Sequence, residues 1–134
     1  MAIAYALEPD LSATEFRDVL VASTLGARRP VDDLVRLERM LFHADIIVTA
    51  RDGARLVGVS RAISDFAYCC YLSDLAVDVA YQRQGIGKRL IDETRQAAGE
   101  GATLILVAAP SAQAYYPKIG MVPIPSGWMI PRTR

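Results

Sequence analysis

Cysteine and histidine are scarce in this chain of 134 residues, and each scarcity excludes a class of protein. The two cysteines, Cys69 and Cys70, are neighbours, and a structural disulfide between neighbours is geometrically poor. With a single histidine, His43, no set of zinc ligands can be assembled, so we expect no metal centre. Two isolated thiols fit a reducing compartment, and we therefore expect a cytoplasmic protein.

Net charge and long hydrophobic runs are missing as well. Fifteen basic and fifteen acidic residues cancel, so the charge does not favour nucleic acid or an anionic membrane as a partner. No apolar run approaches the ~20 residues of a membrane-spanning helix, and the N-terminus lacks the pattern of a signal peptide. Hydrophobic residues are abundant, at 52%, which at this length predicts one folded domain over residues 1–134.

Hydrophobic periodicity and turn signals predict an α/β chain of about six strands and four helices. A capping box over residues 12–15 begins the first helix, and Asp52-Gly53 indicates a β-hairpin. The run 103–109 is apolar almost throughout, which is typical of a central strand covered on both faces. The predicted strands are 3–7, 46–50, 56–63, 68–79, 103–109 and a bent or paired strand in the tail, 121–131. Four helices are predicted: one that begins at residue 12, one over 31–43, one over 88–98 and a short one at 115–116.

The most informative segment is 82–88, which lies between an apolar, strand-like run and a helix-like run. Gly85 and Gly87 expose consecutive backbone N–H groups there, because no Cβ shields them. These groups would lie at the N-terminus of a helix, where negative charge is already favoured. The segment therefore suits a pyrophosphate, although a plain strand–helix turn would use the same glycines.

Two other kinds of phosphate loop do not fit this segment. A dinucleotide fingerprint needs a third glycine where the chain has Leu90. A Walker A loop needs Ser or Thr after Gly-Lys, but Arg89 follows Lys88, and the loop's first glycine is replaced by Gln82.

A second motif follows the apolar run 103–109 and reads Ala-Tyr-Tyr-Pro-Lys-Ile-Gly-Met over residues 114–121. With Gln82-x-x-Gly85-x-Gly87, it resembles the acetyl-CoA signature and the short tyrosine helix of the GCN5-related N-acetyltransferases (GNAT). Met121 departs from the aromatic residue usual there, and Pro117 should end the short helix early. The resemblance covers about residues 46–121.

The resemblance implies a GNAT fold, in which a mixed sheet contains two parallel strands that splay apart. The cofactor implied is acetyl-CoA, used as a co-substrate, with its pantetheine arm in the gap between those strands. The backbone around Leu75, Ala76 and Val77 would pair with the arm and polarise the thioester carbonyl. The pyrophosphate would lie against the loop, and Gln82, Arg83 and Lys88 would add side-chain contacts. The loop residues implied are Gln82, Arg83, Gln84, Gly85, Ile86, Gly87 and Lys88.

The same resemblance assigns two catalytic roles. Tyr116 would protonate the departing thiolate; a phenol (pKa ~10) is adequate for a thiol (pKa ~8.5). Tyr115, its neighbour, remains an alternative, but on a helix the two diverge by about 100° and only one can serve. Asp74 is the best-placed carboxylate for removing the proton of the amine. The alternative that the resemblance implies is a relay of water molecules with no unique base.

The implied function is transfer of an acetyl group from acetyl-CoA to a primary amine by direct attack, with a small molecule as the favoured acceptor. Its site would lie between the first two helices and the tail near Trp128. A protein lysine or α-amino terminus is the alternative acceptor. A non-catalytic CoA-binding regulatory module and a purely structural α/β domain are alternatives of another class. The sequence leaves open whether the chain forms a homodimer.

Overall fold

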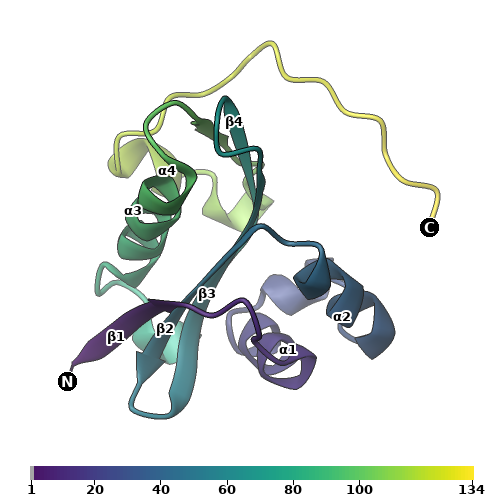
Figure 1. The fold of residues 1–134 in the computed structure, drawn as a ribbon, viewed down its shortest axis with the longest axis vertical. Coiled ribbons are helices and arrows are strands. Elements are labelled where there is room, and N and C mark those ends of the chain that lie inside the picture. Colours follow the sequence, from purple (N-terminus) through teal and green to yellow (C-terminus); the bar gives the residue numbers. More distant parts are fainter. Residues whose placement is uncertain (1) are drawn as a thin grey trace.

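The computed structural model describes residues 2–134 and has helices on both faces of a five-stranded sheet of order β1-β2-β3-β4-β5 (Figure 1). The elements are β1 (Ile3–Leu7), α1 (Ala13–Ala22), α2 (Leu34–Phe42), β2 (Ile46–Asp52), β3 (Arg55–Ser64), β4 (Cys69–Val77), α3 (Ile86–Ala98), β5 (Thr103–Ile105) and α4 (Tyr115–Lys118), with 3₁₀ turns at Leu25–Arg28 (η1), Val79–Tyr81 (η2) and Pro110–Ala112 (η3).

The sheet is mixed, as predicted. Strands β1 to β4 pair antiparallel in sequence order, and β4 pairs parallel with β5 after the crossover through α3. The predicted hairpin lies between β2 and β3, where Gly53 has a φ of 61°. The connection from β1 to β2 contains α1 and α2, β2–β3 and β3–β4 are joined by short connections, and β4–β5 by the crossover through α3.

Two hydrophobic clusters hold the helices to the sheet, one on each face. On one face, α1 and α2 insert Phe16, Leu20 and Leu37 against the strands, and each of these side chains is 0% exposed. On the other face, α3 packs through Ile86 and Leu90. The helices therefore follow their apolar stripes, as the sequence periodicity predicts.

The helix starts follow from side-chain caps. Ser12 Oγ accepts a hydrogen bond from the Glu15 N–H (3.2 Å), which is the predicted start of α1. Asp33 caps α2 by accepting from the Arg36 N–H (3.1 Å). Because the cap is Asp33, α2 begins at Leu34, three residues later than the predicted 31–43; an Asp favours the cap position over the helix interior.

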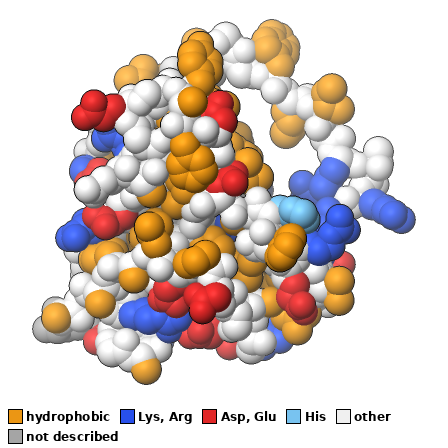
Figure 2. All heavy atoms as spheres, in the orientation of Figure 1, with side chains coloured by type: hydrophobic (Ala, Val, Ile, Leu, Met, Phe, Trp, Pro, Cys, Tyr) orange, Lys and Arg blue, Asp and Glu red, His pale blue; other side chains and the backbone are white. Residues whose placement is uncertain are grey.

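The C-terminal part departs from the prediction in two ways. The predicted strand 103–109 begins at Thr103 as expected, but β5 ends at Ile105 and lies at the edge of the sheet, paired only with β4, so its predicted length and central position are wrong. The C-terminal tail (residues 121–134) forms no helix or strand, so the predicted sixth strand is missing. Figures 1 and 2 show the tail curving away from the body, with hydrophobic side chains along it.

Candidate active site

Strands β4 and β5 separate soon after they begin. They pair only from Cys69 opposite Thr103 to Tyr71 opposite Ile105. Strand β4 continues to Val77 with β3 on one side and no strand on the other. The predicted residues Leu75, Ala76 and Val77 therefore lie on the part of β4 whose outer edge is unpaired. Such an edge offers free backbone N–H and C=O groups to an extended ligand.

The loop 82–88 follows β4 after the single turn η2 and leads into α3, between a strand and a helix as predicted. Its residues 82–85 are exposed, while Ile86 is 2% exposed and anchors the start of α3 in the core. Arg83 (φ 65°) and Gly85 (φ 82°) are both left-handed, which turns the chain sharply into the helix. The N-cap residue Gly85 has no side chain to cap α3, so N–H groups of its first turn can bind an anion, while that of Lys88 faces the Tyr115 hydroxyl.

Gly87 lies under the hydroxyl group of Tyr115. A Cβ added at Gly87 would come within 2.9 Å of the Tyr115 Oη, closer than van der Waals contact. The α4 helix therefore packs its first tyrosine on the first turn of α3, and a larger residue at position 87 would displace the tyrosine hydroxyl. Partial burial raises the pKa of Tyr115, while the charge and backbone N–H of Lys88 act in the opposite direction.

Tyr116 lies beside Tyr115, with the two rings edge to face and their centroids 5.2 Å apart. Burial raises the pKa of Tyr116, and Tyr115 adds to the shift. This phenol therefore keeps its proton to a higher pH than an ordinary tyrosine, whose pKa is about 10. The short helix is a single turn, in keeping with Pro117, and Gly120 (φ 88°) follows it.

Two of the three side chains expected on the pyrophosphate have partners within the chain. The Gln82 Nε2 donates to the carbonyl of Val77 (3.0 Å), so this side chain joins the loop to the end of β4. The Lys88 Nζ forms an ion pair with Asp92 one turn along α3 (2.7 Å). Arg83 is exposed at the outside of the loop. The loop therefore offers a ligand its backbone N–H groups more than these side chains.

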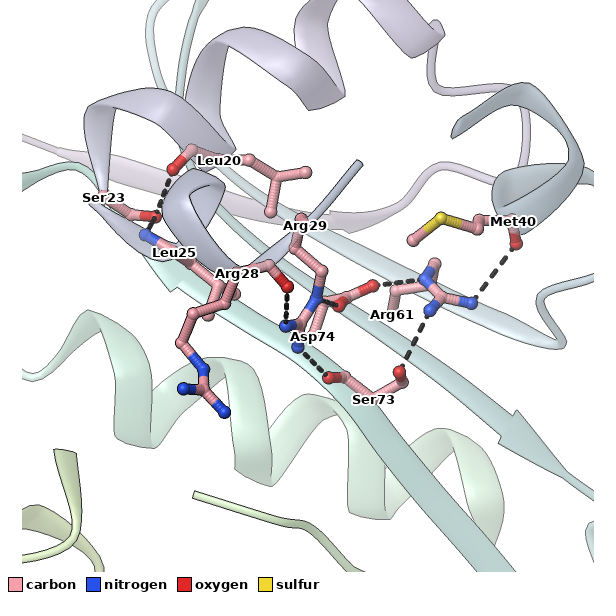
Figure 3. Close-up of polar contacts among 9 residues, drawn as sticks. All are labelled: Leu20, Ser23, Leu25, Arg28, Arg29, Met40, Arg61, Ser73 and Asp74. Atoms are coloured by element: carbon pink, nitrogen blue, oxygen red, sulfur yellow. Dashed lines mark hydrogen bonds and ion pairs between the residues drawn. The ribbon is translucent and has the colours of Figure 1, made fainter. Parts of the chain in front are cut away.

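Asp74, the carboxylate expected to accept the proton of the amine, lies within a buried group of charged side chains. Its side chain is 0% exposed, and its two carboxylate oxygens accept from the Nε atoms of Arg29 and Arg61 (Figure 3). Arg29 also donates to the Ser73 carbonyl (2.8 Å), and Arg61 donates to the Ser73 Oγ (3.0 Å). Both carboxylate oxygens are therefore already occupied as hydrogen-bond acceptors. Asp74 joins the end of η1 and strand β3 to β4.

Arg29 and Arg61 are the residues that sequence reasoning missed. They lie 45 and 13 positions from Asp74, so no local spacing connects them. The register provides the reason: Arg61 pairs with Asp74 across β3 and β4, at a shift of register between Arg61 and Ala62. Such an irregularity bends the strand and redirects its side chains. Its sequence signal is too weak to be recognised.

Comparison with known proteins agrees with this geometry. The family described as "Acetyltransferase (GNAT) domain" matches residues 43–122. Proteins named uncharacterized N-acetyltransferase ycf52 are similar: that of Pyropia yezoensis is 35% identical (90% of this chain, 80% of the relative) and that of Porphyra purpurea 32% (70% and 58%). The chain thus spans little more than half of the Porphyra protein's length. The GNAT family acetyltransferase SP0256 of Streptococcus pneumoniae superposes with a TM-score of 0.81, 24% identity and 99% of both chains covered.

The fold and the family match define an acyltransferase. The chain belongs to the GNAT acetyltransferases, a family that uses acetyl-CoA as its co-substrate. Within residues 2–134, no helix is long and apolar enough to cross a membrane.

Proposed function

We propose that the protein transfers the acetyl group of acetyl-CoA to the primary amine of a small molecule by direct attack. The observation that carries this proposal is the unpaired edge of β4, which ends at an exposed, uncapped helix N-terminus. The edge suits an extended amide-containing arm, and the helix N-terminus suits a pyrophosphate at the end of that arm.

Open space beside Gly85 supports binding of the pyrophosphate at the loop. Gly85 has no atom within 4 Å of where a Cβ would be, so the loop is open on that side. Residues 83–88 would hold the pyrophosphate through backbone N–H groups. An N–H of Leu75, Ala76 or Val77 would polarise the thioester carbonyl, and one such donor is worth about 3 kcal/mol where water is excluded.

In the reaction, the amine nitrogen bonds to the thioester carbon, the C–S bond breaks, and the sulfur receives a proton. We assign that proton to Tyr116. Its raised pKa keeps the phenol protonated at neutral and moderately alkaline pH, which is the state that a proton donor needs. Tyr115 is less suited, because its hydroxyl lies over Gly87 in the loop.

The amine must lose a proton before or during attack. Because both oxygens of Asp74 are engaged by Arg29 and Arg61, we propose that water carries this proton to solvent. Asp74 then acts as a positioning residue that fixes the strand beside which the substrate binds. This is the water relay that the sequence left open as the alternative to a carboxylate base.

The proposed acceptor is a small primary amine or an amino-acid-like molecule. The balanced charge of the chain supports this choice over a highly basic protein tail, for which a large acidic surface would be expected. The acceptor would approach from the side of α1 and α2.

The test is a thiol-release assay with acetyl-CoA and a panel of amines, amino acids and basic peptides. Acetylation of small amines at rates above the hydrolysis of acetyl-CoA is the expected result. Robust acetylation of peptides with none of small amines would overturn the acceptor class. No turnover with any amine, despite acetyl-CoA binding measured by calorimetry, would overturn the reaction itself.

A further inference from the structure

A group of arginines lies beside the gap between β4 and β5, on the face of the sheet that α1 and α2 cover. This arginine cluster consists of Arg28 and Arg29, at the end of η1, and Arg61, in β3. Figure 3 shows Asp74 between Arg29 and Arg61. The pairing of β4 with β5 ends at Tyr71, which precedes Asp74 on the strand. The cluster therefore lies beside the unpaired part of β4, on the side from which the proposed acceptor would approach.

The inner part of the cluster carries a positive charge in excess. The Arg29 and Arg61 side chains are 22% and 7% exposed, and both bind the same carboxylate, Asp74, which is 0% exposed. Within residues 2–134, no second carboxylate forms an ion pair with either arginine. Charges that are removed from water are ordinarily paired. Two guanidinium cations around one carboxylate therefore favour the binding of one further negative charge.

Both inner guanidinium groups keep N–H donors for a ligand. Arg29 donates three described hydrogen bonds, to Asp74, to the Ser73 carbonyl (2.8 Å) and to the Arg28 carbonyl (2.9 Å). Arg61 also donates three, to Asp74, to the Ser73 Oγ (3.0 Å) and to a backbone carbonyl of α2 (3.3 Å). A guanidinium has five N–H donors, so two remain on each arginine.

Arg28 adds a cation at the solvent side of the cluster. Its side chain is exposed, and Figure 3 shows its guanidinium pointing away from Asp74. Within the part of the chain that the structure describes, this guanidinium has no hydrogen bond or ion pair. Arg29 holds the Arg28 carbonyl, so two consecutive arginines are fixed at the end of η1, one engaged and one free. A free guanidinium fork can bind a carboxylate through two parallel hydrogen bonds.

Given the proposed acetyl transfer, on which this inference rests, we propose that the acceptor is an amine that carries a carboxylate. Arg28 binds the carboxylate, and the excess charge of Arg29 and Arg61 attracts it to the gap. The carboxylate is unchanged in the reaction: the amine nitrogen bonds to the thioester carbon as the C–S bond breaks. A positive site also disfavours an ammonium group nearby, so the cluster favours the neutral form of the amine, which is the form that attacks.

The cluster lies close to the proposed reaction centre. Arg29 is anchored on the Ser73 carbonyl, and the proposed donors to the thioester begin at Leu75, about 7 Å farther along the strand. A molecule whose amine and carboxylate are separated by a short carbon chain spans this distance. A polyamine has no group that the cluster would bind, and its second ammonium would be repelled. The proposed acceptors are therefore amino acids of short to medium length.

The experiment compares acceptors of equal length and different charge by thiol release from acetyl-CoA. The pairs are L-alanine with L-alaninamide and ε-aminocaproate with cadaverine, and phosphoethanolamine with ethanolamine tests a phosphate in place of the carboxylate. In at least one of the first two pairs, kcat/KM should be about 10- to 100-fold higher for the carboxylate member. No such preference in either pair would overturn the acceptor class and leave acetyl transfer itself standing. A stronger preference for phosphoethanolamine would overturn the carboxylate in favour of a phosphate.

Arg28→Gln tests the assigned residue, because an exposed side chain without a partner can be replaced without disturbing the fold. KM for the preferred carboxylate acceptor should rise about 10-fold, while KM for the other member of its pair should change less than about twofold. Arg28→Lys should recover part of the loss. Arg95→Gln removes the same charge from an exposed position of α3, on the opposite face of the sheet, and is the matched control. An equal effect of Arg28→Gln on both members, or none, would overturn its role.

Binding measured without turnover separates the anion site from the reaction. L-Alanine and ε-aminocaproate are each titrated into protein saturated with CoA, which cannot transfer an acetyl group, and the heat is measured by calorimetry. If no amine is acetylated, binding of either compound that Arg28→Gln weakens about 10-fold would support the anion site and overturn the proposed reaction. If no amine is acetylated and neither compound binds, both proposals are overturned.

Discussion

Gly87 occupies a position where the space for a side chain is already taken by Tyr115. The Tyr115 Oη would be 2.9 Å from an added Cβ, but the next atom of the ring, Cζ, would be 3.6 Å away. The hydroxyl group alone therefore creates the conflict. The residue pair is a natural subject for a double-mutant cycle.

We expect Gly87→Ala to weaken acetyl-CoA binding about 10-fold, because the displaced tyrosine disturbs the loop. Calorimetry should show much of that loss restored in Gly87→Ala/Tyr115→Phe, where the obstructing oxygen is gone. Gly87→Asp should abolish binding in either background, since it puts a negative charge where the phosphate is proposed to lie. A folded Gly87→Asp variant with unchanged affinity would place the binding site elsewhere.

Tyr116 and Tyr115 are separable by removing one hydroxyl at a time. Tyr116→Phe should lower kcat about 10- to 1000-fold with little change in acetyl-CoA affinity, as expected for the loss of a general acid. Tyr115→Phe is the matched control and should keep most of the turnover. Steady-state kinetics and calorimetry on both variants decide the matter, and the reverse pattern would transfer the role to Tyr115.

At the scale of the elements, the buried carboxylate of Asp74 joins three of them. Arg29 follows η1, Arg61 lies in β3 and Asp74 lies in β4. The Arg61 and Asp74 side chains are 7% and 0% exposed, and Arg29 is 22% exposed. Removing the central charge from such a group leaves buried cations without a partner, which is strongly destabilising.

Asp74→Asn should therefore lower the free energy of unfolding by about 3 kcal/mol, measured by urea denaturation. Asp18→Asn, which removes an exposed ion pair with Arg17, is the control and should change stability by less than about 1 kcal/mol. If Asp74 were the general base, its variant would instead lose turnover at unchanged stability. That result would restore the catalytic role expected from the sequence.

For the whole molecule, the proposed chemistry predicts the pH dependence of the rate. The attacking amine must be neutral, so kcat/KM should rise as pH approaches the amine pKa, ~10 for a simple alkylamine. The pKa of Tyr116 is raised by burial, so its protonated, donating form persists through that range. No falling limb is expected below about pH 10. A profile flat from weakly acidic to alkaline pH, with chemistry rate-limiting, would exclude amine deprotonation as a step.

Features that depend on residues close together in the sequence were predicted better than features that depend on residues far apart. The loop 82–88 and the tyrosine helix depend on a few neighbouring residues, so their positions were predicted correctly. The partners of Asp74 depend on the register of two strands and were missed. The run 103–109 was predicted as a central strand because it is apolar, but composition does not determine where a strand ends or whether it lies at an edge of the sheet. Its length, its central position and the sixth strand were predicted wrongly.

The early separation of β4 from β5 has a consequence for how the backbone exchanges its amide hydrogens with deuterated water. From residue 72 to 77, β4 has a strand partner on one side only. Alternate amides face β3 and are protected, while those between them face the gap and should exchange much faster. A bound pantetheine arm would slow the fast set and leave the slow set unchanged. The mass-labelling pattern along this one strand would thus record, amide by amide, where the substrate lies.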